Sequence, residues 1–103
     1  MNASSLASVE YPILKLQEIP FDDPRSCYMF QPSDEKPFLV TAAAVNMYRE
    51  SIRHCLNRLQ RLAKEKGGLD YLQVFDDPDR PEGLWFIEDD DGGAITALLP
   101  SDH

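Results

Sequence analysis

One apolar stripe near the middle of the chain constrains the fold more than any other feature. Its residues are spaced 3, 4, 3, 4 and 3 apart, which places them on one face of an α-helix. They are Val45, Tyr48, Ile52, Cys55, Leu59 and Leu62. Thr41 is a favourable N-cap, and Gly67 with Gly68 favours an end, because glycine readily takes the left-handed conformation there. The pattern predicts one long helix over residues 42–66.

Three strands are predicted after this helix. Residues 70–76, 83–88 and 94–99 each alternate side chains between two faces with the period of a β-strand. The stretches between them, "DPDRPEG" and "DDDGG", contain the Asp, Pro and Gly residues that tight connections require. Residues 70–99 are therefore predicted to form an antiparallel β-meander, with the helix packed across one face.

The N-terminal part has weaker patterns. Residues 1–8 are small and polar and are expected to be flexible. Residues 9–19 are compatible with a strand, and Pro12 favours an edge position because proline cannot donate to a ladder. Four prolines exclude a long helix over residues 17–41 and predict an extended arm lying over the core, in which residues 26–30 could form a further short strand.

Together these patterns predict a single α+β domain over residues 1–103. Its predicted order is β-α-β-β-β, with one long helix on an antiparallel sheet of three to four strands. The heptad spacing of the helix would also suit a coiled-coil dimer. A core helix is the preferred interpretation, because the strands that follow need a helix to cover their apolar face.

Charge is distributed unevenly along the chain, whose net charge is -8. Residues 42–68 hold six Lys and Arg against two acids, whereas the residues from Asp70 onward hold ten acids against one Arg. Direct nucleic-acid binding is disfavoured, because phosphates require a basic face. The acidic part instead favours a protein partner that is basic or that handles nucleic acid.

The sequence also bears on location and redox state. Residues 1–11 have neither the basic nor the apolar region of a signal peptide, and no stretch has the roughly 20 apolar residues of a membrane span. A cytoplasmic location with no membrane contact is expected. Cys27 and Cys55 do not form a CxxC pair, so two reduced, buried thiols are expected.

Two segments resemble a known family. "LDYLQVF" (69–75) and "WFIEDDDGGAITALLP" (85–100) resemble a family of small bacterial and phage proteins catalogued as a domain of unknown function. The resemblance covers about 23 of the 103 residues, and the proline-containing N-terminal third departs from the family pattern. It implies a helix, a hairpin, an acidic turn and a Leu-Leu ending, in a bacterial or phage setting. It implies no catalytic residues.

The acids of the predicted hairpin turns form the first candidate site. They are Asp76, Asp77, Asp79, Glu82, Glu88, Asp89, Asp90 and Asp91. They could be turn residues kept in water, ligands of a metal, or a recognition surface for a basic partner. Their spacing does not fit a calcium loop of the EF-hand type, so no metal is expected.

The basic residues of the predicted helix form the second candidate surface. They are Arg49, Arg53, Arg58 and Arg61. Such a stripe is commonly a solvated helix face. The sharper interpretation is a contact for an acidic partner, or for the acidic turns of a second copy of this chain.

Catalysis has little support in the sequence. His54 and Cys55 are neighbours on a helix, about 100° apart around its axis, so they cannot face each other. No nucleophile elbow, zinc motif or phosphate-binding glycine loop is present. No catalytic residue and no cofactor are therefore expected.

The sequence favours a non-enzymatic, small acidic protein that binds and modulates a partner protein. The specific hypothesis is a phage- or mobile-element-type inhibitor of a nucleic-acid-handling enzyme, such as a restriction or CRISPR effector. The alternative is a structural or adaptor module, acting as a homodimer or through an aromatic docking surface formed by Trp85, Phe86 and the aromatic residues of the extended arm. A third hypothesis is a small metal-binding or hydrolytic domain.

Overall fold

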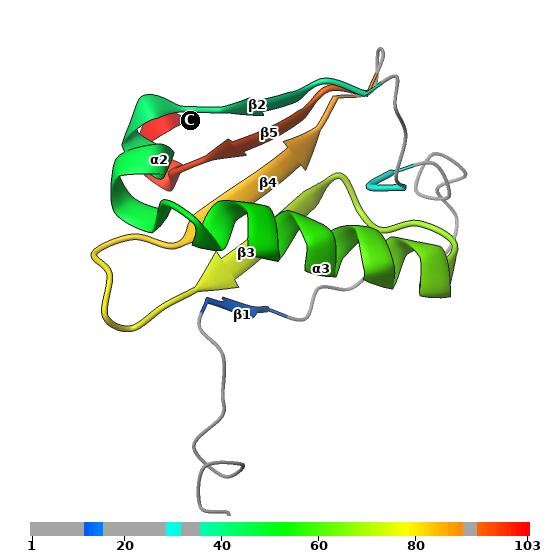
Figure 1. Ribbon diagram of the computed structural model, residues 1–103, viewed down its shortest axis with the longest axis horizontal. Helices are drawn as coiled ribbons and strands as arrows, with labels where there is room; N and C mark the ends of the chain where they lie inside the picture. Colours follow the sequence, from blue (N-terminus) through cyan, green and yellow to red (C-terminus); the bar gives the residue numbers. More distant parts are fainter. Residues whose placement is uncertain (1–11, 16–28, 32–35, 90–92) are drawn as a thin grey trace, which may run out of the picture.

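The computed structural model describes residues 12–15, 29–31, 36–89 and 93–103 of the chain. Its described helices are α2 (Ala42–Tyr48) and α3 (Ser51–Lys66), with a short 3-10 helix at Pro100–Asp102. Its strands are β1 (Ile13–Leu14), β2 (Phe38–Val40), β3 (Leu72–Asp76), β4 (Leu84–Glu88) and β5 (Ile95–Leu98). They form one sheet in the order β1-β3-β4-β5-β2, with α3 lying across it (Figure 1). The predicted α+β class is confirmed.

The centre of the sheet is the predicted meander. β3 pairs antiparallel with β4, and β4 pairs antiparallel with β5. The register places Trp85 opposite both Val74 and Leu98. Burial alternates along β4, where Leu84 and Phe86 are fully buried and Trp85 is half-buried. The predicted period of two therefore corresponds to two distinct faces of the sheet.

β1 forms one edge of the sheet. It pairs antiparallel with β3, and Lys15 N donates to Val74 O at 2.8 Å. Pro12 directly precedes this strand, in agreement with the edge position that a proline favours. Only two residues of the predicted strand 9–19 are in β conformation within the described residues 12–15.

The other edge, β2, corrects the prediction. Phe38–Val40 was expected within the extended arm, but it pairs in parallel with β5. Ile95 N donates to Pro37 O, and Thr41 N donates to Ala97 O. The sheet is thus wider than predicted and mixed in direction. Three residues are too short a run for alternation to reveal a strand.

Little of the remaining arm is described. Met29 and Phe30 form a turn and are both buried. Residues 16–28 and 32–35 lie outside the described residues, and so does most of the short strand considered at 26–30.

The predicted helix over 42–66 is divided in two. Arg49, at φ 48°, interrupts it, and its N–H donates back to Val45 O at 2.9 Å. The hydroxyl of Tyr48 donates to the carbonyl of Glu82, which fixes the end of α2 over the β3–β4 connection. α2 buries Ala44 and Tyr48, whereas Val45, expected on the core face, is 46% exposed. The apolar spacing survives the break, so spacing alone could not reveal it.

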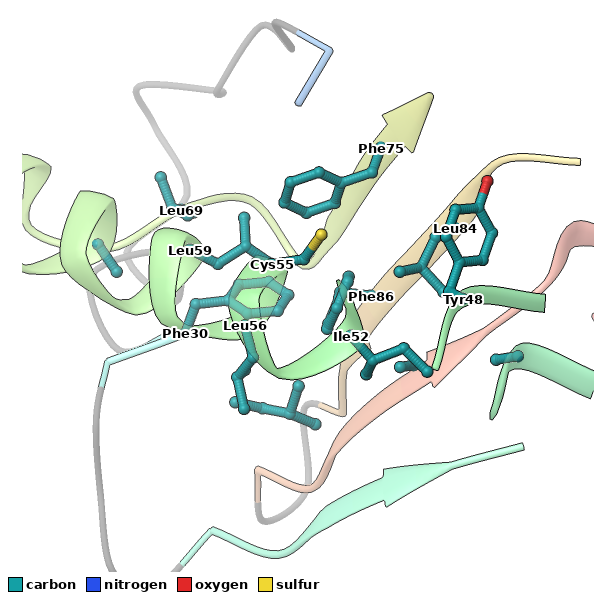
Figure 2. Packing of buried hydrophobic residues seen from close by; sticks show 14 of the residues in the cluster. Phe30, Tyr48, Ile52, Cys55, Leu56, Leu59, Leu69, Phe75, Leu84 and Phe86 are labelled. Atoms are coloured by element: carbon teal, nitrogen blue, oxygen red, sulfur yellow. The ribbon is translucent and has the colours of Figure 1, made fainter. Parts of the chain in front are cut away.

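The core lies between the helices and one face of the sheet (Figure 2). Cys55 and Leu59 of α3 pack over Phe75 and Phe86, whose rings meet edge to face at 5.5 Å. Phe30 adds a fully buried ring from the N-terminal part. Full burial of each such side chain contributes about 1.5–3 kcal/mol. α3 ends as predicted at Gly67, which is left-handed.

No helix in the described part of the chain is long and apolar enough to cross a membrane.

Candidate functional site

The strand register divides the sheet into an inner face, which packs on the helices, and an outer face. The outer face consists of two cross-strand rows. They are Leu72–Ile87–Thr96–Leu39 and Val74–Trp85–Leu98. Both rows are uncharged, and Thr96 supplies the only polar side chain in them. The face is therefore a continuous apolar layer that spans β3, β4, β5 and β2, in which Leu39 is exposed, Leu98 is buried and the other residues are half-buried.

The helices do not cover this outer face. The buried side chains of α2 and α3 belong to the inner core, and none of the outer-face residues is part of that core. Trp85 and Ile87 remain half-buried, and Leu39 is 52% exposed. The imidazole of His103 packs edge-on against Trp85, with ring centroids 5.6 Å apart.

The aromatic docking hypothesis is narrowed by this arrangement. Phe86 is fully buried in the inner core, where it contacts Phe75 and stacks with Phe38 at 6.3 Å. Trp85 points to the opposite face. Of Trp85 and Phe86, Trp85 is thus the one available to a partner, and Phe30 of the arm is fully buried.

The acids of the β3–β4 connection lie at one end of the sheet, and they differ in exposure. Asp76 and Asp79 are exposed, whereas Asp77 is only 9% exposed. Asp77 Oδ1 accepts a hydrogen bond from Asp79 N at 2.9 Å, and its Oδ2 lies 3.8 Å from Arg80 Nε. Asp77 therefore organises the turn.

Glu82 also has a structural role. Its carboxylate accepts from Ser101 N at 2.9 Å and from Ser101 Oγ at 2.8 Å. Its carbonyl accepts from Tyr48. The connection is thereby tied at Glu82 to both α2 and the C-terminal 3-10 helix.

The remaining acids belong to the opposite end of β4. Glu88 is 4% exposed and points to the inner face, where its Oε1 accepts from Phe30 N at 2.6 Å and from Lys36 Nζ at 3.1 Å. Asp89 is exposed. Asp90 and Asp91 lie outside the described residues.

These positions do not make one continuous acidic cluster, because β4 separates the two groups. Asp76 follows the inward-pointing Phe75 within β3, so strand alternation directs it toward the outer side, and Asp89 is exposed directly after the end of β4. The outer face therefore has an exposed carboxylate at either end. An apolar surface with acidic ends is well suited to bind a surface with the complementary arrangement.

The four arginines of the predicted basic surface have different environments. Arg49 is exposed at the helix break, and the guanidinium of Arg53 lies 6.0 Å over the ring of Phe38. Arg58 and Arg61 instead lie together, lining a concavity of about 310 Å³ with His54 and Asn57. The structure thus brings two of the four residues into one site.

The reactive groups of the core are held in their neutral forms. Burial raises the pKa of the Cys55 thiol to about 12, and burial together with Asp77 raises the pKa of Tyr48 to about 12. A thiol with such a pKa is a poor nucleophile at neutral pH. Among the described residues, no three His, Cys, Asp or Glu side chains are grouped to hold a metal ion.

The outer face was missed at the sequence level, although β4 contains a usable signal. "LWFI" is apolar at every position, so both of its faces are apolar. Strands covered on both faces have such continuous apolar runs, whereas a strand with one solvated face alternates apolar and polar residues. One helix cannot cover both faces, so the run indicates that a second surface must be covered.

In comparisons with known proteins, no family model, no curated protein and no solved structure matches the chain. The resemblance of residues 69–75 and 85–100 to a bacterial and phage family therefore stays a prediction.

Proposed function

We propose that the chain is a non-enzymatic binding module that docks a partner protein on the outer face of its sheet. The observation that carries this proposal is the apolar outer face itself, because both described helices pack on the inner side. Contiguous apolar residues that are at least partly exposed, as Leu39, Trp85 and Ile87 are here, often mark an interaction site when they form a large patch. Trp85 is the natural anchor, since tryptophan is enriched among the residues that dominate binding energy.

Charge selects the kind of partner. The net charge of -8, with Asp76, Asp79 and Asp89 exposed beyond the ends of β4, favours a partner whose apolar patch is flanked by Lys or Arg. Enzymes that handle nucleic acid present such basic surfaces. The specific proposal is inhibition of a restriction or CRISPR effector by occupation of its basic binding surface.

The central experiment compares two substitutions of similar exposure. Leu39→Glu places a charge on the outer face, and Val45→Glu places the same charge on α2; the wild-type residues are 52% and 46% exposed. A partner is identified by pull-down from the native host, purified, and titrated with each variant. Leu39→Glu is expected to weaken binding at least tenfold, while Val45→Glu leaves it unchanged. Equal affinities for both variants would contradict docking on this face.

The acidic contribution is tested separately with the same purified partner. Replacing Asp89, Asp90 and Asp91 together by Asn is expected to weaken binding and to flatten its dependence on salt concentration. An unchanged affinity and salt slope would remove the electrostatic part of the proposal. The proposed docking on the apolar outer face would still stand after that result, because it is tested by Leu39→Glu.

The second candidate is a homodimer formed through the same face. It is favoured by the absence of charge from the two rows, because two copies can then stack without burying an ion. Sedimentation at several protein concentrations separates the candidates. A dimer that is insensitive to salt and is dissociated by Leu39→Glu supports the homodimer, and a monomer at all concentrations excludes it.

A further inference from the structure

The structure contains a second candidate binding site, on the solvent side of α3 and distinct from the outer face of the sheet. His54, Asn57, Arg58 and Arg61 recur at the spacing of one helix face and line a concavity of about 310 Å³. Small-molecule sites have volumes of about 300–1,000 Å³, so this concavity has room for a small ligand. Its walls supply donors and positive charge.

Arg58 is held in place by the fold. Its Nη2 donates to the carbonyl of Pro12 at 2.8 Å, and its guanidinium lies 5.4 Å over the ring of Phe75. Its Nε is shielded from solvent and has no hydrogen-bond partner in the described chain. The guanidinium is therefore a positive charge held in place by Pro12 and Phe75, so little conformational entropy would be lost when an anion binds beside it.

Arg61 and Asn57 complete the site with exposed side chains. Glu65 is one turn further along α3, but no salt bridge joins it to Arg61, and no described acid pairs with Arg58. Over its length, α3 has five Lys and Arg against this one acid. His54 already has a partner within the chain, so the argument rests on the other three residues.

We propose that this concavity binds a tetrahedral oxyanion, namely a phosphate group. The planar guanidinium forms paired hydrogen bonds to phosphate oxygens, and two arginines together neutralise its charge. Asn57 adds an amide donor to the same group. The group could belong to free inorganic phosphate or to a phosphate monoester, and both present the same oxygens to the site.

The test is isothermal titration of the full chain with inorganic phosphate, phenyl phosphate and acetate at constant ionic strength. Both phosphates are expected to bind, and acetate is not. Stronger binding of phenyl phosphate would identify a monoester as the ligand, and stronger binding of inorganic phosphate would identify the free ion.

The variants are Arg61→Gln and, as the matched control, Arg49→Gln. Both arginines are exposed and both changes remove one charge, but Arg49 is outside the concavity. Arg61→Gln is expected to weaken phosphate binding about tenfold or more, and Arg49→Gln less than twofold. Circular dichroism verifies that both variants fold. Absence of phosphate binding, or equal loss in the two variants, would overturn the proposal.

Discussion

The carboxylate of Glu88 accepts a hydrogen bond from the backbone N–H of Phe30 at 2.6 Å, joining residues 58 positions apart. The same oxygen also lies 3.1 Å from the ammonium group of Lys36. Phe30 has a positive φ of 62°, which is unfavourable for a bulky side chain, and its ring is fully buried. Glu88 therefore holds the turn at Met29 and Phe30 against the sheet.

Replacement of Glu88 should reveal this anchoring role. Glu88→Ala leaves the Phe30 N–H without its acceptor and removes the carboxylate from beside the Lys36 ammonium, which still donates to Gln31 O. We expect the substitution to lower the free energy of unfolding by about 2–4 kcal/mol. Asp89→Ala, at the exposed neighbouring position, should change it by less than about 0.5 kcal/mol. Urea denaturation measures both. If both substitutions changed the free energy of unfolding only slightly, Glu88 would have no anchoring role and would be a solvated acid like Asp89.

Gly83 is predicted to tolerate no side chain. A Cβ there would meet the carbonyl oxygen of Phe75 at 2.7 Å, and this oxygen belongs to the backbone of a central strand. We expect Gly83→Ala to cost about 1–3 kcal/mol in thermal or urea unfolding.

Gly67 supplies the control for Gly83. Its φ is +74°, but a Cβ there would meet nothing within 4 Å. Gly67→Asn should therefore cost less than about 1 kcal/mol, since Asn tolerates the left-handed conformation. A smaller loss of stability in Gly83→Ala than in Gly67→Asn would contradict the close approach of Gly83 to the backbone of β3.

Stability is predicted to fall at alkaline pH. The folded state raises the pKa of Cys55 from 9.0 and that of Tyr48 from 10.0, each to about 12. Unfolding therefore releases protons above pH 9, so the stabilisation is complete below pH 9 and is lost progressively as pH rises toward 12. Each group contributes up to about 1.4 kcal/mol per pH unit while it titrates only in the unfolded state.

The measurement is the urea midpoint between neutral pH and about pH 11. Cys55→Ala should reduce the slope of this dependence even though it also lowers stability at neutral pH, because the buried thiol is then absent. A midpoint that did not change over this range would contradict the burial of both groups.

The stability of the N-terminus of α2 is predicted to depend on the N-cap Thr41 and on its contact with Asp102 near the C-terminus. Thr41 Oγ1 accepts from Ala44 N at 3.1 Å and donates to Asp102 Oδ2 at 2.7 Å. Thr41→Ala should cost about 1 kcal/mol, and Thr41→Ser, which keeps the hydroxyl, should cost much less.

The same contact gives a pH signature. The hydrogen bond from Thr41, followed by that from Leu99 N, lowers the pKa of Asp102 below 3.8. NMR titration of this carboxyl should show its pKa returning toward 3.8 in Thr41→Ala, while Thr41→Ser retains the lowered value. An identical pKa in both variants would exclude the contact in solution.

Local patterns in the sequence predicted the centre of this fold. The three strands of the meander are short runs rich in β-forming residues and bounded by Asp, Pro and Gly, and α3 repeats its apolar residues with the period of 3.6 that a helix requires. The left-handed conformation of Gly67 and the N-cap at Thr41 could likewise be predicted locally, since each depends on the chemistry of one residue.

The missed features depend on contacts between distant segments. Arginine has no preference for the φ of 48° seen at Arg49, so the residue type at that position did not indicate a break in the helix. β2 depends on β5, whose residues are more than fifty positions away. Of the candidate acids, Glu88 looked equivalent to Asp89 in the sequence, and its contacts with Phe30 and Lys36, which are distant in the chain, distinguish the two.

The strand order β1-β3-β4-β5-β2 has a consequence for biosynthesis. The ribosome makes β1 and β2 before the strands with which they pair. β1 must remain unpaired until β3 has been made, and β2 must wait for β5, the last strand in the chain. During that interval the exposed Leu39 and its neighbours are accessible to other nascent chains. The acidic connections repel copies of the same chain, and they therefore oppose aggregation during the period before β2 has paired with β5.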